Sequence, residues 1–550
     1  MKRFREFFRD NPMLALALLA FFAVYSASLN NGFHRDDHPH IAGNAAIRDL
    51  SNFPKLFSRD YFVLSGSVAY RPMVTAFRFA QYRVFGTDAR LWRLFNLLVH
   101  ALNAVLLCLV VIRVSGSRPA AAAAAALFLL HPAHTEALNY ISNGQPDMLC
   151  LLFLCAASLA YLSGRLAWTA AWFLLALFSK EMALAFPVLL LIYEYSRGGL
   201  RRAWRLPALL AAAALLFAVW RLAWFRAGPV FLDNAQADAA FGFSAQGSFT
   251  ALLQFPALAG YYLKLLVWPA ALSVEIDRLL PETGFFSLFN ALLAWLALLA
   301  LAAWGIMSRL VRPWALFAFA FFAALLPVSG LVPLTSRVQE HFVYVPSALF
   351  CALAGILFAR GSAAGGKARA AALAAVMVAL GASAVRVYAR NADWRSPAAL
   401  AEADLKAFPG SPVAMVNLAV QKKASGDRAG ALALCQAALE GGFAGGEVHF
   451  LLADLYLVDG LREKAAAAAR AGLEKEPGSP DSWVNAARVL ARAGLLDEAE
   501  TAAREATARF GYFPPAFSTL GEILRLRGRP GEAAGMFSEA ARLGGRTRAR

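Results

Sequence analysis

Carboxylate, imidazole and cationic side chains gather in a few short segments between long apolar stretches. The segment HRDDHPHIAGN contains the adjacent carboxylates Asp36 and Asp37, and the YRP segment after it contains Arg71. A carboxylate can take a proton from an acceptor hydroxyl. A guanidinium or ammonium can hold a phosphate and stabilise its charge as it leaves. This combination therefore indicates transfer of a group from a phosphate carrier to a hydroxyl.

Three later segments add side chains of the same kinds. They read HPAHTEALNYISNGQPD, SKE and TSRVQEHFVYVPS. We predict Asp36 or Asp37 as the base, and Arg71, Lys180 or Arg337 as the phosphate-binding group. The remaining residues predicted to line the cavity are His131, His134, Glu136, Asp147, Glu181, Glu340 and His341.

Other interpretations of these residues stay open. A pair of aspartates after an apolar stretch is often a solvated loop or a helix cap. The histidines and glutamate of HPAHTE are potential ligands of a divalent metal, but their spacing matches no strong zinc motif, so we assign no metal ligand and no certain cofactor. We predict that His100, within an apolar stretch, is a hydrogen-bonded core residue.

The composition places most of the chain in a membrane. Of 550 residues, 59% are hydrophobic and 16% are charged, whereas soluble domains carry about 25% charged residues. The net charge of +17 comes mostly from short loops between apolar stretches, where Lys and Arg set orientation. We therefore expect membrane lipids, and no nucleic acid, among the partners.

Eleven stretches are apolar enough to be predicted spans. They are 12–30, 95–112, 119–132, 148–164, 167–179, 182–195, 206–225, 287–308, 314–330, 342–359 and 369–388. With eleven spans the basic loops share one side, which the positive-inside rule makes cytoplasmic. A further crossing by 251–269 would break this pattern, so we predict that it is interfacial or re-entrant. The polar segments and the C-terminus then lie outside.

From residue 412 the sequence repeats every 34 residues. Gly426, Gly460, Gly494 and Gly528 form one column, and three columns of small residues accompany it. They are Ala431, Ala465, Ala499 and Ala533; Ala419, Ala453, Ala487 and Gly521; and Ala438, Gly472, Ala506 and Ala540. This is the tetratricopeptide pattern of paired antiparallel helices. We predict a membrane domain over 1–395, a linker over 396–411 and four repeats over 412–545, all α-helical.

The ordered motifs resemble the transmembrane and tetratricopeptide-repeat O-mannosyltransferase family, within the GT-C superfamily of polytopic glycosyltransferases. The resemblance covers the segments quoted above and also YLKLLVWPAALSVE, LLPVSGLVP and RNADWRS. Gln145 departs from the pattern, because relatives often carry Arg at that position. Without this Arg, the sequence shows no charged neighbour for Asp147.

The resemblance implies inverting transfer of a mannose-like sugar from a polyprenyl-phosphate donor to an acceptor hydroxyl, with Asp36 or Asp37 as base. The acceptor would be protein Ser or Thr, recruited by the repeats on the non-cytoplasmic face. The Ala- and Arg-rich composition favours a bacterial inner membrane and periplasmic repeats. Two alternatives remain: a GT-C transferase that modifies a lipid or polysaccharide, and a non-enzymatic scaffold or transporter that displays the repeats.

Overall fold

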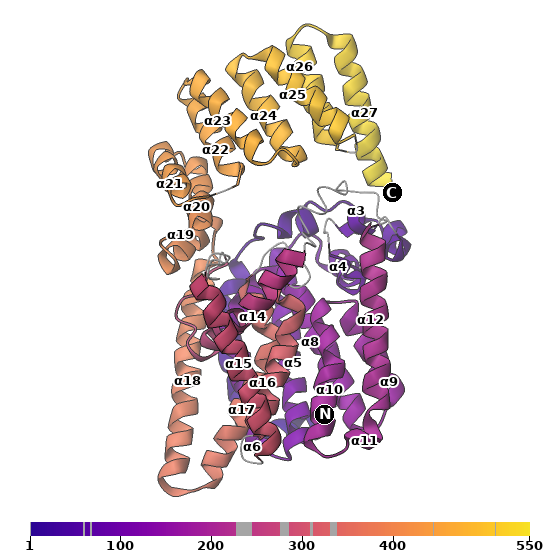
Figure 1. Cartoon of the computed structure of the whole chain (residues 1–550), viewed down its shortest axis with the longest axis vertical. Coiled ribbons are helices and arrows are strands. Elements are labelled where there is room, and N and C mark those ends of the chain that lie inside the picture. The colour runs from indigo at the N-terminus through magenta and orange to yellow at the C-terminus, as the bar shows by residue number, and fades with distance from the viewer. Residues whose placement is uncertain are drawn as a thin grey trace. The chain divides into compact units, whose positions relative to one another are not determined.

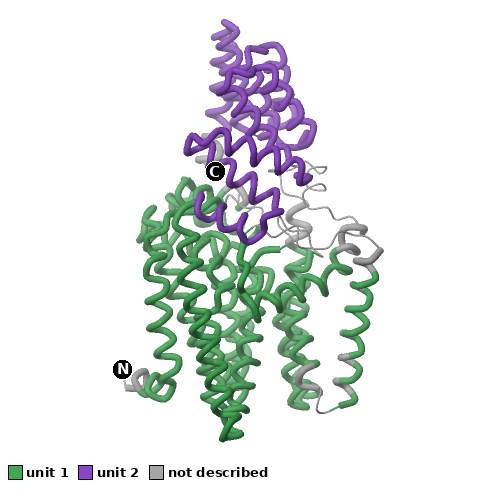
Figure 2. The backbone as a smooth tube through the Cα atoms, turned by 90° about the vertical axis from the view of Figure 1, so that its left-hand side faces the viewer, with its two compact units in different colours: residues 1–228, 237–396 green, residues 229–236, 397–550 purple. Residues whose placement is uncertain are grey.

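The computed structural model is all α-helical in the residues that it describes and divides into two compact units. The described residues are 2–58, 61–65, 69–226, 245–274, 285–308, 312–330, 338–443, 445–511 and 513–549. One unit takes residues 1–228 and 237–396, and the other takes residues 229–236 and 397–550 (Figures 1 and 2).

The first unit is a bundle of long apolar helices with short helices in its connections (Figure 1). Its elements in chain order are α1 (Lys2–Arg9), α2 (Pro12–Tyr25), η1 (Ser26–Asn30), η2 (His38–Ala42), η3 (Ala46–Arg48), η4 (Leu50–Phe57), α3 (Tyr61–Ser65), α4 (Pro72–Phe85), α5 (Ala89–Ser115), α6 (Arg118–Leu129), η5 (Pro132–His134), α7 (Thr135–Asn139), α8 (Ile141–Leu162), α9 (Leu166–Leu177), η6 (Glu181–Ala185), α10 (Phe186–Ser196), α11 (Leu200–Ala203), α12 (Arg205–Arg226), α14 (Ala245–Val267), α15 (Phe285–Met307), α16 (Arg312–Leu325), η8 (Leu326–Val328), η9 (Glu340–Val343), α17 (Tyr344–Ala363) and α18 (Gly366–Asp393).

Five stretches of the described residues are long and apolar enough to cross a membrane. They are Pro12–Asn30, Ala89–Ser115, Ile141–Leu162, Glu340–Ala363 and Gly366–Asp393. Every predicted span overlaps a helix, and the segment 251–269 overlaps α14. Several of the other helices are shorter than a full crossing requires. The chain is thus a membrane protein, while the number of eleven spans stays a prediction.

Small residues let α6 and α17 pack closely at the centre of this bundle. Residues 120–126 of α6 are all alanine, and all are buried. Gly355 of α17 faces them, and a Cβ atom there would lie 2.2 Å from the Ala120 carbonyl oxygen. Ser117 begins α6 by accepting a hydrogen bond from the Ala120 amide. This close approach of small residues is how apolar helices associate in a membrane.

The second unit is a tetratricopeptide-repeat solenoid. After α19 (Pro397–Ala407), its helices pair as α20 (Pro412–Ala424) with α21 (Arg428–Glu440), α22 (Glu447–Val458) with α23 (Arg462–Lys475), α24 (Pro480–Ala493) with α25 (Leu496–Arg509), and α26 (Pro514–Leu526) with α27 (Pro530–Ala549) (Figure 1). The four turn glycines have φ between 74° and 90°. Residues with a side chain adopt this left-handed conformation only with strain, whereas glycine adopts it readily. A Cβ atom on Gly521 would lie 2.8 Å from the Phe537 ring, which explains a small residue at that column.

The predicted linker contains a helix. Within 396–411, α19 occupies Pro397–Ala407 and is grouped with the repeats, with Leu400 and Ala401 buried. The two units divide at residue 396. The sequence of this stretch lacks the repeat columns, so periodicity alone could not assign it to the solenoid.

Candidate functional site

The two aspartates of the first loop lie in a tight turn that follows η1. The Asp37 carboxylate closes the turn by accepting a hydrogen bond from the His34 amide at 3.0 Å. Arg35, directly before Asp36, has φ 41°, a left-handed conformation that residues other than glycine rarely adopt. Strain of this kind persists where surrounding contacts hold it, and it is common at functional sites.

Contacts from α5 and from the end of α18 hold this loop in place. The buried guanidinium of Arg93, on α5, donates to the carbonyl oxygens of Asn31 and Gly32. The Asn31 side chain donates to the carbonyl oxygen of Asn391, at the end of α18. The His34 ring hydrogen-bonds the carbonyl oxygen of Trp394 at 2.8 Å. The RNADWRS segment thus anchors the first loop, although the two are about 360 residues apart.

The neighbouring carboxylates have different environments. Asp37 is fully buried and also accepts a hydrogen bond from the Ser142 amide at 2.7 Å. Burial raises the pKa of Asp37, and the two backbone donors oppose that shift. Asp36 is only half-buried, and its amide donates to the Tyr140 hydroxyl at 3.3 Å. Asp36 is therefore the more accessible carboxylate of the pair, while Asp37 holds the turn together.

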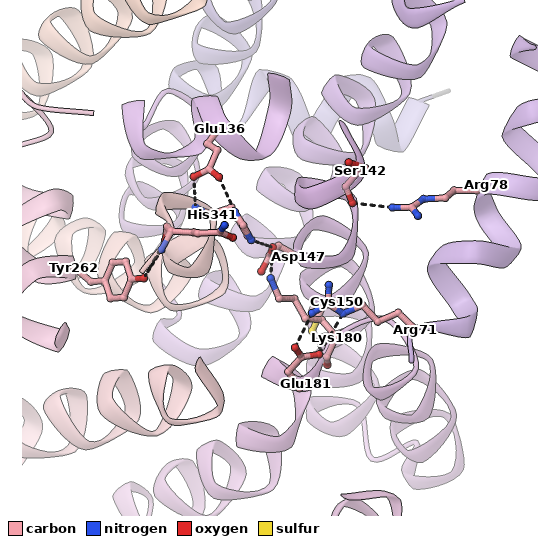
Figure 3. Close-up of polar contacts among 11 residues, drawn as sticks. Arg71, Arg78, Glu136, Ser142, Asp147, Cys150, Lys180, Glu181, Tyr262 and His341 are labelled. Carbon is pink, nitrogen blue, oxygen red and sulfur yellow. Dashed lines mark hydrogen bonds and ion pairs between the residues drawn. The ribbon is translucent and has the colours of Figure 1, made fainter. Parts of the chain in front are cut away.

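Charged residues from the other predicted segments meet in one network of ion pairs (Figure 3). The Arg71 guanidinium makes two hydrogen bonds to the Glu181 carboxylate, at 2.6 and 3.3 Å. The Lys180 ammonium lies 2.5 Å from Asp147, and neither side chain is exposed. Segments up to 110 residues apart in the chain are thus brought together.

The same network continues to the segment before α17. The His341 ring bonds the Glu136 carboxylate at 2.9 Å and lies 3.9 Å from Asp147. The other Glu136 oxygen accepts a hydrogen bond from the His341 amide at 3.0 Å. Burial lowers the pKa of Lys180, and the Asp147 carboxylate opposes that shift.

Asp147 does have a charged neighbour, contrary to the doubt raised by Gln145. Lys180, from the SKE segment, supplies Asp147 with the positive charge that Gln145 of α8 does not carry. Gln145 instead donates to the side-chain oxygen of Gln81, on α4, at 2.8 Å. Only tertiary packing brings Lys180 to Asp147, because 33 residues separate them.

Arg78, which the sequence motifs did not indicate, interacts electrostatically with Asp37, Asp36 and Arg71. It lies on α4, seven residues after Arg71, which is the N-cap residue of that helix. Its guanidinium donates to the Ser142 carbonyl oxygen at 2.8 Å, and its buried Nε has no partner in the described residues (Figure 3). Burial lowers the pKa of Arg78 to about 10, while Asp37 and Asp36 raise it and Arg71 lowers it. The spacing YRPMVTAFR could have indicated it.

The remaining predicted residues are separate from the ion-pair network or lie outside the described part. The His131 and His134 rings are buried and bond the carbonyl oxygens of Leu266 and Phe128. Glu340 accepts a hydrogen bond from the Ser273 amide at 2.6 Å. Arg337 lies outside the described residues.

Two further predictions concern a metal and His100. Within the described residues, no group of three His, Cys, Asp or Glu side chains is arranged to hold a metal ion. The buried His100 ring bonds the Tyr344 hydroxyl at 2.7 Å and the Leu129 carbonyl oxygen at 3.1 Å, as expected of a core residue.

Comparison with curated proteins finds a relative of known class. Protein O-mannosyl-transferase Tmtc1 of Drosophila melanogaster is 34% identical over 150 residues. The chain is related to this transferase. The match covers 26% of the chain and 17% of the length of the fly protein. No protein-family model matches.

The solved structures similar to this chain include tetratricopeptide-repeat proteins. YrrB, described as a TPR protein with an unusual peptide-binding site, is 17% identical, covering 26% of this chain and 75% of its own, with a TM-score of 0.23. MamA is 16% identical, covering 28% of this chain and 90% of its own, with a TM-score of 0.25. Yeast Tom70 is 13% identical, covering 76% of this chain and 88% of its own, with a TM-score of 0.25.

Proposed function

We propose that the chain is a membrane glycosyltransferase that moves a mannose-like sugar from a polyprenyl phosphate to a protein Ser or Thr hydroxyl, on the non-cytoplasmic face. One observation carries the proposal: the half-buried Asp36 carboxylate and the partly exposed Arg71 guanidinium both interact electrostatically with the buried Arg78, in a chain similar to an O-mannosyl-transferase. Asp36 takes the proton from the acceptor hydroxyl as it attacks the anomeric carbon, and the polyprenyl phosphate leaves. The enzyme needs no covalent intermediate, and the sugar inverts.

Arg71 is the proposed ligand of the donor phosphate. Its side chain is 22% exposed, whereas Lys180 is fully buried and already paired with Asp147. A phosphate that approaches Arg71 competes with Glu181 for a bidentate contact, which guanidinium groups make well. Arg78 supports the site from α4, where its guanidinium donates to the Ser142 carbonyl oxygen.

Replacing Arg71 by Gln is expected to raise the KM for the polyprenyl-phosphate sugar by about tenfold or more, because a charged hydrogen bond worth about 1.5–3 kcal/mol is lost. The measurement is initial-rate kinetics of the purified protein with a short-chain donor. Arg83→Gln is the matched control, since Arg83 is an exposed residue of the same helix. Equal effects of both variants on the KM for the donor would exclude Arg71 as a ligand of the donor phosphate.

The concave face of the repeats is the proposed acceptor-binding surface. A groove of about 980 Å³ is lined by the first helices of the four repeats, from Val420 on α20 to Leu526 on α26. Two columns at the repeat spacing line it: Leu451, Asn485 and Thr519, and Val420, Asp454, Arg488 and Glu522.

The groove offers polar groups that no described residue satisfies. The Asn485 amide and the Arg488 guanidinium make no hydrogen bond within the described part of the chain, and the buried Thr519 hydroxyl has no partner there. Neighbouring inner helices lie about 8–10 Å apart. Extended chain rises about 3.3 Å per residue, so every third residue of a peptide meets the next repeat. An extended acceptor segment fits this spacing.

Replacing Arg488 by Glu is expected to raise the KM for extracted envelope proteins as acceptors about tenfold, because an exposed cation of the groove changes sign. Hydrolysis of the donor in the absence of acceptor should not change. Arg462→Glu, on the second helix of its repeat and outside the groove, is the control. Unchanged acceptor kinetics in Arg488→Glu would exclude this face as the acceptor surface.

A further inference from the structure

A second cavity lies on the first unit, away from the ion-pair network. It has a volume of about 350 Å³ and is lined by α10, α16 and α17. The lining residues follow helical spacing on α17, where Leu349, Ala352, Leu353, Ile356 and Arg360 contribute. None of the residues of the candidate site lines this cavity.

The polar and apolar lining residues are separated along the groove. Leu189, Leu316, Phe317 and Ala320 are among the apolar ones, and no carboxylate lines the groove. The polar lining residues Tyr193, Ser196 and Arg360 all lie in the last turns of α10 and α17. The groove is therefore apolar along its body and polar at one end.

The polar end is also strongly basic. Arg360 is exposed and makes no side-chain hydrogen bond or ion pair in the described part of the chain. The Arg197 guanidinium bonds the Tyr193 hydroxyl at 2.5 Å, and Arg201 and Arg202 follow on α11. Glu194, the carboxylate of this turn of α10, accepts a hydrogen bond from Tyr161 and interacts electrostatically with Arg197. Arg360 has no ion pair with a described carboxylate, so an anionic group at this end meets a free cation.

The dimensions match one leaflet of a bilayer. Leu349 and Arg360 are eleven residues apart on α17, which corresponds to about 16 Å of helix. A leaflet contributes about 15 Å of hydrocarbon. By the predicted orientation, this basic end faces the cytoplasm, where anionic lipids attract clusters of Lys and Arg.

We propose that this groove binds one anionic phospholipid of the cytoplasmic leaflet. An acyl chain lies along Leu349, Leu353 and Phe317, and the headgroup phosphate contacts the Arg360 guanidinium at the polar end. The site is distinct from the proposed donor site, and it does not depend on the enzymatic proposal. Bound lipid would fix α16 between α10 and α17, both of which it contacts.

The test is native mass spectrometry of the full-length protein, released from detergent with phosphatidylglycerol, phosphatidylcholine or glycerol phosphate added. We expect one retained phosphatidylglycerol, and little retention of phosphatidylcholine or glycerol phosphate. Arg360→Gln should weaken phosphatidylglycerol binding about tenfold, since a charge-assisted hydrogen bond is lost. Arg369→Gln, an exposed arginine in the first turn of α18, is the control and should bind as the unaltered protein does.

Ala320→Trp is a second variant that fills the apolar body and leaves the basic end intact. It should also weaken phosphatidylglycerol binding. Equal retention of the two phospholipids by the unaltered protein would overturn the proposal, and so would equal losses in Arg360→Gln and Arg369→Gln. Retention of glycerol phosphate as strong as that of the lipid would identify a site for a free phosphate and would overturn the proposed acyl-chain contact.

Discussion

Asp36→Asn is expected to lower the rate of sugar transfer by about 10²–10⁴-fold, the usual contribution of a general base. The carboxamide keeps the size of the side chain but cannot take the proton from the acceptor hydroxyl. Because Asp36 is half-buried and Asp37 holds the turn, folding and donor binding should persist. The measurement is the initial rate of transfer at saturating donor, together with donor affinity.

Asp37→Asn is the matched control for this prediction. The Asp37 carboxylate accepts backbone hydrogen bonds from His34 and Ser142 through its two oxygens, and an amide can accept through only one. The substitution leaves a buried donor unpaired, which costs about 1–3 kcal/mol of stability. We expect a lower melting temperature with transfer retained per folded molecule. Loss of transfer in Asp37→Asn with normal stability would instead make Asp37 the base.

Lys180→Met is expected to destabilise the membrane domain by about 3–5 kcal/mol, because it leaves the Asp147 carboxylate buried without its cation. Both side chains are fully buried and their charged atoms lie 2.5 Å apart. His341, at 3.9 Å, offers Asp147 only a distant contact. The measurement is thermal unfolding of the purified protein in detergent.

The double variant Lys180→Met with Asp147→Leu distinguishes the cost of an unpaired Asp147 carboxylate from the cost of changed side-chain packing. It removes both charges, so most of the lost stability should return. Glu181→Gln provides a comparison, since the Arg71–Glu181 pair is partly exposed and its loss should cost less. If the double variant is as unstable as Lys180→Met, the unpaired carboxylate is not the cause of the loss.

The sequence predicted the helical class and the repeats because both leave periodic signals. The glycine column at the repeat spacing corresponds to turn residues with positive φ. Apolar length predicted helices at every expected span, yet it cannot count crossings where helices such as α9 and α10 are short. The helix within 396–411 left no signal because it lacks the repeat columns.

The residue types of the candidate site could be predicted from the sequence, but the partner of each charged side chain could not. Carboxylates and cations of different loops were selected, but pairing Lys180 with Asp147 or Arg71 with Glu181 requires the packing of α4, α8 and η6. Burial also could not be predicted, and it separates the roles proposed for Asp36 and Asp37. Arg78 was missed because it lies within a helix and outside the polar segments.

Sugar transfer by the purified protein is the most direct test of the proposed function. The assay supplies a labelled short-chain polyprenyl-phosphate mannose and extracted envelope proteins, and mass spectrometry locates the sugar. We expect hexose on Ser or Thr of a protein acceptor, and no labelled protein when the Asp36→Asn variant replaces the unaltered chain. Label that appears only in lipid or polysaccharide, or no transfer by protein that binds the donor, would contradict it.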